Sequence, residues 1–305
     1  MSLLGLFKGK GPSGFGYNST SAEVTEGVDL TGRTYLVTGC NSGLGLETMQ
    51  TLSRRGATVL AVARTVEKAR EAGAGLERIV PVACELSEPG SVRAAVASVI
   101  AGGHSISGII ANAGIMALPE KHIAHGVELQ LLTNHFGHFI LITGLLDQLT
   151  DDGRVVMLSS AGHAATYPEG VRVDDLDATR GYGGVRAYGQ SKLANLLFAR
   201  ELSKRLPKSG QTANAVHPGV IVTNLGRHMN KALIATFDAL GPVFATKSIP
   251  QGAATQLYVA VHPDAASVNG EYWADSNVTK SSRHGRDADL ARRLWEATEA
   301  KLTDL

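Results

Sequence analysis

The chain has 305 residues, 44% of them hydrophobic and 19% charged, which suits one large α/β domain or two small ones. A formal net charge of +1 argues against nucleic acid as the main partner, because phosphate binding needs a basic surface. Cys40 and Cys84 lie in unrelated segments without metal-site spacing, so we expect no structural disulfide and a reducing, cytoplasmic location. No apolar run reaches the roughly 18 residues of a membrane-spanning helix.

Residues 1–30 are interpreted as an N-terminal arm. Its first ten residues place several apolar side chains beside two lysines, but the stretch is too short for a signal peptide. Contact with a membrane surface is an alternative that we do not favour over a disordered or docked arm. Thr20 and Ser21 are good N-caps and predict one short helix between Ser19 and Glu26.

From Arg33 onward, strand and helix patterns alternate. Short apolar runs predict strands at residues 35–37, 58–62, 79–82, 106–111, 154–159, 212–216 and 271–274. The stretches between them predict helices that end near Arg55, begin at Thr65, and cover residues 91–100, 127–149, 185–206, 251–261 and 287–301. This alternation predicts a doubly wound parallel sheet of about seven strands with helices on both faces, a Rossmann fold. No linker divides the chain, so residues 31–305 are predicted to form a single domain.

A glycine-rich turn at residues 38–45 joins the first strand to the first helix. Gly39 permits the tight turn, Gly43 lets the backbone approach a pyrophosphate, and Gly45 lets the helix pack close to the strand. The start of the helix offers free N–H groups and positive partial charge to phosphates. Such a turn is weak evidence alone, but its place between a strand and a helix indicates a dinucleotide site.

The end of the second predicted strand points to the kind of dinucleotide. Folds that prefer NAD usually carry an acidic residue there, which binds the ribose 2′-hydroxyl. This chain has Arg64 instead, whose guanidinium can pair with a 2′-phosphate. The sequence therefore predicts NADP(H), with NAD(H) as the less favoured cofactor.

Several motifs in order resemble the short-chain dehydrogenase/reductase family. Residues 38–45 match its TGxxxGxG turn, 112–114 its NAG motif, 188–192 its YxxxK motif, and Pro218-Gly219 with Thr223 its PG…T segment. The resemblance covers about residues 30–300. Within the family, the stretches at 132–139, 159–163, 188–195 and 217–220 are most similar to the retinol-dehydrogenase-like branch, which commonly prefers NADP(H).

The resemblance implies a set of site residues. The family's catalytic residues fall on Asn134, Ser160, Tyr188 and Lys192, with Ser160 preferred to Ser159 because the catalytic serine is usually the second of such a pair. Further cofactor contacts are implied at Asn41, Ser42, Leu44, Glu85, Leu86, Asn112, Ala113, Gly114, Pro218, Gly219, Ile221 and Thr223. Thr223 and the Ile221 backbone would bind the nicotinamide carboxamide. Glu85 departs from the family's usual aspartate, which leaves its contact open.

The chemistry explains why these residue types belong together. An unperturbed tyrosine has a pKa near 10, whereas acid/base work near neutrality favours a value of about 7. Lys192 lies four residues after Tyr188, on the same helix face, and its ammonium would lower the tyrosine pKa and bind the ribose. Ser160 would donate to the substrate oxygen, and Asn134 would hold a water that links Lys192 to solvent.

The remaining features bear on metals, substrate and partners. His135 and His138 lie three residues apart without a carboxylate or cysteine beside them, so we expect no metal site. Residues 224–249 are apolar and are predicted to close over a lipophilic or bulky carbonyl or alcohol substrate. The long interval between Ser160 and Tyr188 is a candidate wall of that pocket. The oligomeric state is left open between a monomer and a homo-oligomer, which would be a dimer or a tetramer.

Two functions of other classes compete with catalysis. One is a nucleotide-binding regulatory protein that has the same fold but no turnover. The other is a membrane-associated scaffold that uses the N-terminal arm. The complete set of Asn134, Ser160, Tyr188 and Lys192 argues for the enzyme.

Overall fold

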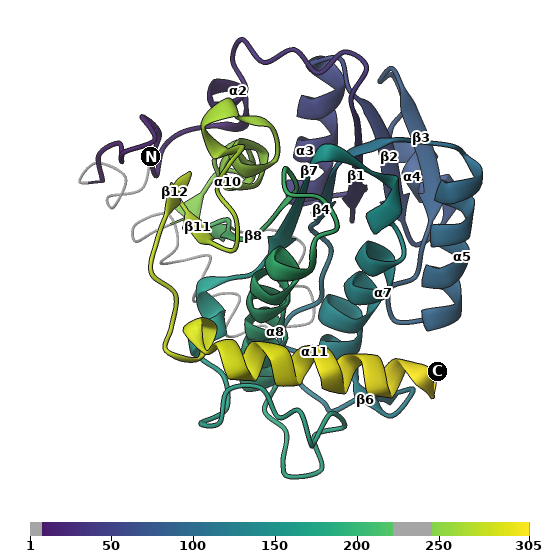
Figure 1. Ribbon diagram of the computed structural model, residues 1–305, viewed down its shortest axis with the longest axis vertical. Helices are drawn as coiled ribbons and strands as arrows, with labels where there is room; N and C mark the ends of the chain where they lie inside the picture. The colour runs from purple at the N-terminus through teal and green to yellow at the C-terminus, as the bar shows by residue number, and fades with distance from the viewer. Residues whose placement is uncertain (1–7, 222–245, 305) are drawn as a thin grey trace.

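The computed structural model describes residues 8–221 and 246–304, which are built around one central sheet (Figure 1). Its strand order is β12-β11-β8-β7-β4-β1-β2-β3. The strands are β1 (Thr34–Thr38), β2 (Thr58–Ala63), β3 (Ile79–Ala83), β4 (Ile106–Ala111), β7 (Leu149–Leu158), β8 (Thr212–His217), β11 (Tyr272–Ala274) and β12 (Asn277–Val278). All neighbours are parallel except β11 and β12. The predicted doubly wound parallel fold is confirmed, with β12 as an unpredicted antiparallel edge strand.

Helices cover both faces of this sheet. One layer holds α2 (Ser21–Val24), α3 (Gly43–Arg54), α4 (Val66–Ala72) and α10 (Ile249–Val261). The other holds α5 (Pro89–Ala101), α7 (Gly137–Thr143), α8 (Gly184–Arg205) and α11 (Ala288–Thr303). The long helix α8 packs between β7 and β8 on one side and α11 on the other (Figure 1).

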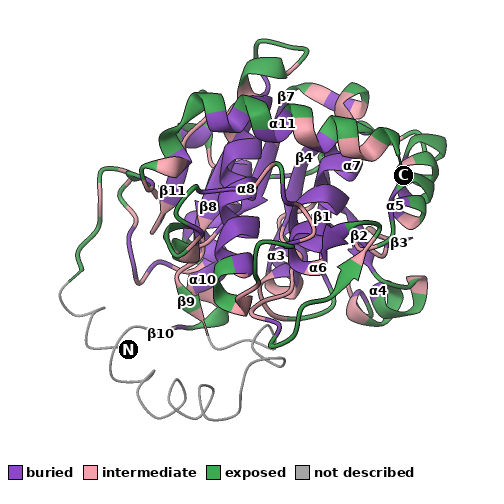
Figure 2. Ribbon diagram, turned by 90° about the horizontal axis from the view of Figure 1, so that it is seen from below, coloured by how far each residue is buried: buried purple, intermediate pink, exposed green. Residues whose placement is uncertain are grey.

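The central residues of the strands are mostly apolar and buried, because both faces of the sheet are covered. In β1, Leu36 belongs to the core beneath α5 and α8, whereas Val37 belongs to the core beneath α3 and α10. Ile109 and Ile110 of β4 alternate in the same way. Figure 2 shows these strands as buried and the surrounding helices exposed only on their outer sides. Two separate cores therefore hold the sheet rigid beneath the site.

The single helix predicted for residues 127–149 is wrong. A hairpin of β5 (Ile123–Ala124) and β6 (Val127–Glu128) comes first, followed by α6 (Leu129–Leu131), a π-helical turn η1 (Leu132–Phe136), α7 and a 3-10 turn η2 (Leu146–Gln148). The side chain of Glu128 accepts hydrogen bonds from the backbone N–H groups of Gln130 and Leu131. This cap starts the helix two residues later than predicted.

Strand β7 also differs from its prediction, since it starts at Leu149 and ends at Leu158. Its pairing with β4 passes from Ile106 opposite Leu149 to Gly108 opposite Arg154, so the intervening residues bulge out of register. Asp152 and Gly153, which are residue types common in turns, lie inside this irregular stretch. Ser159 and Ser160 therefore follow the strand.

Residues 8–30 of the N-terminal arm are docked on the domain. The Ser13 N–H donates to Asn277 Oδ1 at 3.0 Å, and Asn277 Nδ2 donates to the Phe15 carbonyl at 3.1 Å. The Phe15 ring packs edge-on against Tyr258 of α10. The predicted short helix is present as α2, capped by Thr20. Among residues 8–221 and 246–304, no helix is both long and apolar enough to cross a bilayer.

Candidate active site

The glycine turn lies where β1 meets α3, at the carboxyl edge of the sheet. Gly39 and Gly43 have φ of +68° and +53°, which side chains rarely adopt. A Cβ on Gly45 would overlap the Gly39 carbonyl oxygen and lie 2.6 Å from Asn112 Nδ2. The side chain of Ser42, the N-cap, makes no cap hydrogen bond, and Asn41 and Ser42 are exposed. The amides at this helix start are thus available to a ligand.

Substituting alanine for Gly45 tests the close packing of this turn. We expect the free energy of unfolding to fall by about 1–3 kcal/mol, because backbone must move to admit the methyl group. Urea denaturation measures it. Gly90→Ala is the control, since no atom lies within 4 Å of a Cβ there. Equal stability of the two variants would contradict the packing argument.

Thr38 links the glycine turn to the helix that carries Asn134. Its hydroxyl accepts the N–H groups of Asn112 and Ala113, both at 2.9 Å, and contacts His138 Nε2 at 2.9 Å. His138 Nδ1 lies 2.8 Å from the Asn134 carbonyl, so Nδ1 carries the proton and Nε2 accepts from Thr38. Burial lowers the pKa of His138 to about 4, which keeps it neutral.

Sequence reasoning missed this role of His138, because Thr38 is a hundred residues away and no local pattern pairs them. His135 has a separate partner: its Nε2 contacts Thr298 Oγ1 at 3.0 Å inside a group of aromatic rings. Across the described part of the chain, no three His, Cys, Asp or Glu side chains are grouped to hold a metal ion.

Asn134 lies in the π-helical turn and is fully buried. Its amide donates to the Ile115 carbonyl and to Ser191 Oγ, each at 2.9 Å, and accepts the Ile115 N–H at 2.8 Å. A Cβ on Gly114 would lie 3.0 Å from Asn134 Oδ1 and 3.4 Å from Lys192 Nζ. Asn134 therefore fixes the loop after β4, and only a second lone pair of Oδ1 is left for the predicted water.

Ser160, Tyr188 and Lys192 come together beside this loop. A Cβ on Gly162 would lie 3.2 Å from the Tyr188 ring and 3.3 Å from Ser160 Oγ, which shows how closely the two side chains approach. The Ser160 hydroxyl is near enough to the Tyr188 phenol to act on its pKa, which it lowers. Ser159, by contrast, donates to the Lys192 carbonyl at 2.8 Å and is buried. The geometry thus sets Ser160, and not Ser159, at the tyrosine.

The pKa of Tyr188 beside Lys192 differs, in the protein alone, from the sequence prediction. Burial raises the pKa of Tyr188 to about 12, although Ser160 opposes the rise. Burial lowers the pKa of Lys192 to about 8. Lys192 Nζ donates to the Leu158 carbonyl at 3.0 Å and lies 5.8 Å from the centre of the Tyr188 ring. Burial thus moves the tyrosine pKa upward in the protein alone, and the lowering expected from Lys192 and a positively charged nicotinamide ring stays a prediction.

Arg64 directly follows β2 and is exposed. Its Nε lies 3.7 Å from Oε2 of Glu85, which follows β3, and both side chains keep substantial contact with solvent. Glu85 Oε1 also accepts from Ser87 Oγ at 2.9 Å. Leu86 is buried, and its carbonyl lies against Gly137 at the start of α7. The sheet therefore brings Arg64 and Glu85 to the edge that the glycine turn occupies.

The Pro218-Gly219 segment lies on the other side of the glycine turn. Residues Val220–Ile221 form β9, which pairs in parallel with β10 (Thr246–Lys247). A Cβ on Gly252 of α10 would overlap the Ile221 side chain and lie 2.8 Å from Leu44. The segment after β8 and the turn after β1 thus meet across α10.

Residues 224–249 are the segment predicted to close over a substrate, and the structure describes only its end. Residues 246–249 form β10 and the start of α10, where Ser248 is the N-cap. Residues 224–245 and Thr223 lie outside the described residues.

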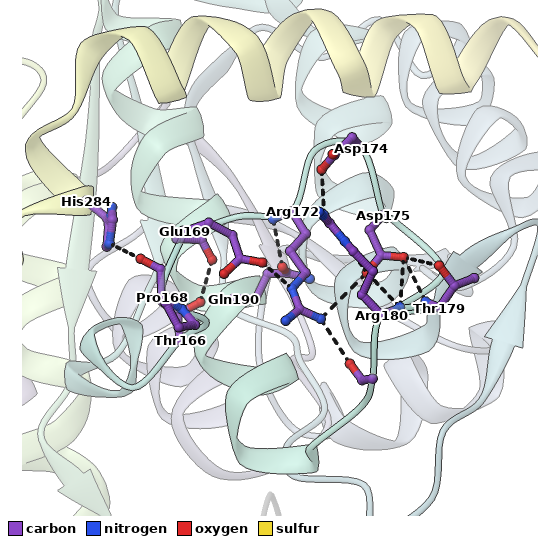
Figure 3. Close-up of polar contacts among 12 residues, drawn as sticks. Thr166, Pro168, Glu169, Arg172, Asp174, Asp175, Thr179, Arg180, Gln190 and His284 are labelled. Atoms are coloured by element: carbon purple, nitrogen blue, oxygen red, sulfur yellow. Dashed lines mark hydrogen bonds and ion pairs between the residues drawn. The ribbon is translucent and has the colours of Figure 1, made fainter.

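The long interval between Ser160 and Tyr188 is held by a polar network (Figure 3). Arg172 Nε donates to Glu169 at 2.6 Å, and the Arg172 guanidinium lies 3.6 Å from the centre of the Tyr167 ring. The Arg172 N–H donates to Gln190 of α8 at 2.9 Å. A cavity of about 460 Å³ lies beside it, lined by Tyr167, Arg172 and residues 180–186. The network fixes one wall of a cavity just before Tyr188.

Known proteins are similar to this chain over most of its length. The family model for short chain dehydrogenases matches residues 33–233. The chain belongs to the short-chain dehydrogenase family. This dehydrogenase is 40% identical to the short-chain dehydrogenase TIC 32 A of Brassica napus over 97% of each chain. It is 38% identical to human retinol dehydrogenase 13, covering 90% of this chain and 86% of the relative.

A solved structure adds a ligand-bound comparison. The angucycline C-6 ketoreductase LanV, which was solved with bound NADP, superposes on the dehydrogenase with a TM-score of 0.64 at 25% identity. The match covers 80% of this chain and 94% of LanV. The family model and the retinol dehydrogenases among the relatives confirm the family resemblance of the sequence.

Proposed function

We propose that this dehydrogenase is an NADP(H)-dependent oxidoreductase that interconverts a ketone or aldehyde and an alcohol, with Tyr188 as general acid/base. The observation that carries the proposal is the approach of Ser160, Tyr188 and Lys192 beside the glycine turn. A cofactor bound at that turn supplies the hydride, and this chain's residues then handle the proton on the substrate oxygen. The names of its relatives, retinol dehydrogenase and ketoreductase, support a carbonyl and alcohol substrate of lipophilic or bulky character.

The site residues fit a dinucleotide. Gly39 and Gly43 have positive φ and no side chain, so the backbone of the turn is bare as a phosphate cradle requires, and the uncapped start of α3 adds donors for phosphate. Asn112 and Ala113 are tied to Thr38 at the cradle's floor. In carbonyl reduction, Tyr188 would donate its proton to the substrate oxygen and Ser160 would stabilise the developing charge. Lys192, at the far side of the tyrosine, would orient the ribose and favour the tyrosinate.

The test is an activity screen with NADPH and a panel of aliphatic, aromatic and polycyclic carbonyls, and with NADP⁺ and the matching alcohols. Oxidation of NADPH on at least some bulky carbonyls is expected. Tight binding of NADPH without turnover on any compound would instead support the alternative, a nucleotide-binding regulatory protein. The intact catalytic set is the observation against that alternative.

The NADP preference is predicted to depend on Arg64. In Arg64→Asp we expect the ratio of kcat/KM for NADPH over NADH to fall by ~10–100-fold, because a charge-assisted contact to the 2′-phosphate contributes about 1.5–3 kcal/mol. Steady-state kinetics with both cofactors measures this. Arg70→Asp makes the same charge change on α4 and is the control. An unchanged ratio in Arg64→Asp would remove Arg64 from the cofactor site.

A further inference from the structure

His217, the last residue of β8, bonds to two separate loops of the candidate site. Its Nδ1 accepts the Ala161 N–H at 3.1 Å and, more weakly, the Gly219 N–H at 3.4 Å. Ala161 directly follows Ser160 and opens the 3-10 turn η3 (Ala161–Ala164). Gly219 lies in the Pro218–Ile221 segment, which the family resemblance places at the nicotinamide side of the cofactor. One nitrogen atom therefore connects the serine loop with the cofactor loop.

We propose that His217 is a positioning residue that sets the Ser160 loop against the Pro218–Ile221 segment, so that substrate oxygen and nicotinamide are presented to Tyr188 together. The inference rests on the proposed function, because it concerns how that site is assembled. His217 itself bonds to neither Ser160 Oγ nor Tyr188 in the described contacts; it acts through the backbone of the residues beside them. Small displacements of such loops reduce turnover because the reacting groups lose alignment.

The bonding requires a neutral imidazole, since Nδ1 accepts both N–H groups through its lone pair. Among the described residues, the titratable groups that act on His217 come from four neighbours: Lys247 of β10, Asp275 after β11, His163 of η3 and Lys8 of the arm. Burial and then the Lys247 charge lower the pKa of His217 to about 4. The imidazole is therefore neutral across the range in which the enzyme would work.

A second contact fixes the cofactor loop from the other side. Gly219 has φ of +93°, and a Cβ there would lie 2.7 Å from the aliphatic Cδ of Lys247. Lys247 is buried, and its ammonium pairs with Asp275 at 2.7 Å. The loop is thus packed against a lysine stem on one side and bonded to His217 on the other. Loss of the hydrogen bond to His217 would release the Gly219 amide but would leave Gly219 packed on the Lys247 side chain, so the fold is expected to survive.

The test compares His217→Ala with His217→Asn, because an asparagine oxygen can take the place of Nδ1 as acceptor. With His217→Ala we expect kcat for carbonyl reduction to fall about tenfold and the Kd of NADPH to rise about threefold. The Kd of 2′,5′-ADP, which lacks the nicotinamide half, should not change. Hydrogen exchange should be faster at the Ala161 and Gly219 amides. His217→Asn should restore each value to within about threefold of wild type.

His262→Ala is the matched control. His262 Nδ1 also accepts a backbone N–H, that of Asp264, but His262 follows the C-terminal end of α10, whereas the Pro218–Ile221 segment lies near its start. It should leave kcat and both dissociation constants unchanged. Wild-type kcat and wild-type exchange in His217→Ala would overturn the inference. So would equal weakening of NADPH and 2′,5′-ADP in both variants, which is the sign of a general folding defect. If the wild-type protein binds no NADPH, the proposed function fails, whereas the exchange at the two amides still reports on His217.

Discussion

Replacing Tyr188 with phenylalanine is expected to lower kcat by ~10²–10⁴-fold and to leave the Kd of NADPH within about threefold of wild type. The substitution removes only the phenolic oxygen, on whose pKa Ser160 acts, while the ring stays packed beside Gly162. The hydrogen-bond partner of Ser160 Oγ among the described residues is the backbone N–H of Gly162, so no second acidic side chain is bonded to Ser160 there. NADPH absorbance in single turnover and NADPH fluorescence titration measure the two quantities.

Tyr258→Phe serves as the matched control. Tyr258 is a buried tyrosine of α10 that packs against Phe15 and Trp273, among residues of the arm and β11. Its kcat should equal that of wild type. A Tyr188→Phe protein that keeps more than about a tenth of wild-type kcat would show that the proton comes from elsewhere.

The raised pKa of Tyr188 gives the two reaction directions different pH dependence. Reduction uses the neutral phenol, which predominates at every pH below about 12 in the protein alone. Oxidation of an alcohol needs the tyrosinate, whose formation becomes easier as pH rises and as positive charge is placed nearby. The oxidation rate should therefore rise with pH through the neutral range, whereas the phenol itself imposes no alkaline loss on reduction.

The sequence predicted the sheet well because its signals are local. The near-continuous apolar runs that contain Leu36 and Ile109 mark strands buried on both faces, and glycines at 39 and 45 mark a turn that admits no side chain. The choice of Ser160 over Ser159 could be made only by resemblance. The structure gives the physical reason for this choice, since the Ser159 hydroxyl donates its hydrogen bond to the Lys192 carbonyl.

The failures concern contacts between residues far apart in the chain. The apolar period of residues 127–149 predicts one helix, but it does not show that the Glu128 side chain caps the backbone or that a π-helical turn sets Asn134 against Ile115. His138 and His217 bond across the fold, to Thr38 and Ala161, and no local pattern records either pair. The pKa of Tyr188 follows from its burial, which a four-residue spacing to Lys192 does not reveal.

Removing the Lys192 charge is the second test with a large expected effect. In Lys192→Met we expect kcat to fall by ~10²-fold and the Kd of NADPH to rise, because the ammonium no longer favours the tyrosinate or binds the ribose. In wild type, kcat/KM for NADPH reports groups of the free protein. Lys192 has a pKa of about 8 and is charged below it, so this value should decline as pH rises through about 8. In Lys192→Met the decline should be absent.

Asn195→Leu separates the charge of Lys192 from its hydrogen bond. Asn195 Nδ2 and Lys192 Nζ both donate to the Leu158 carbonyl, at 2.9 and 3.0 Å, so either variant leaves that carbonyl with one donor. Any loss from the bond alone should then appear in both proteins, whereas a loss from the charge appears only in Lys192→Met. Because both side chains are buried, each variant is also compared by urea denaturation. Two results would contradict a role for the Lys192 charge: a loss of kcat in Asn195→Leu as severe as that in Lys192→Met, or an alkaline decline that persists in Lys192→Met. Lys192 would then act as a structural hydrogen-bond donor, and proton transfer by Tyr188 would proceed without its charge.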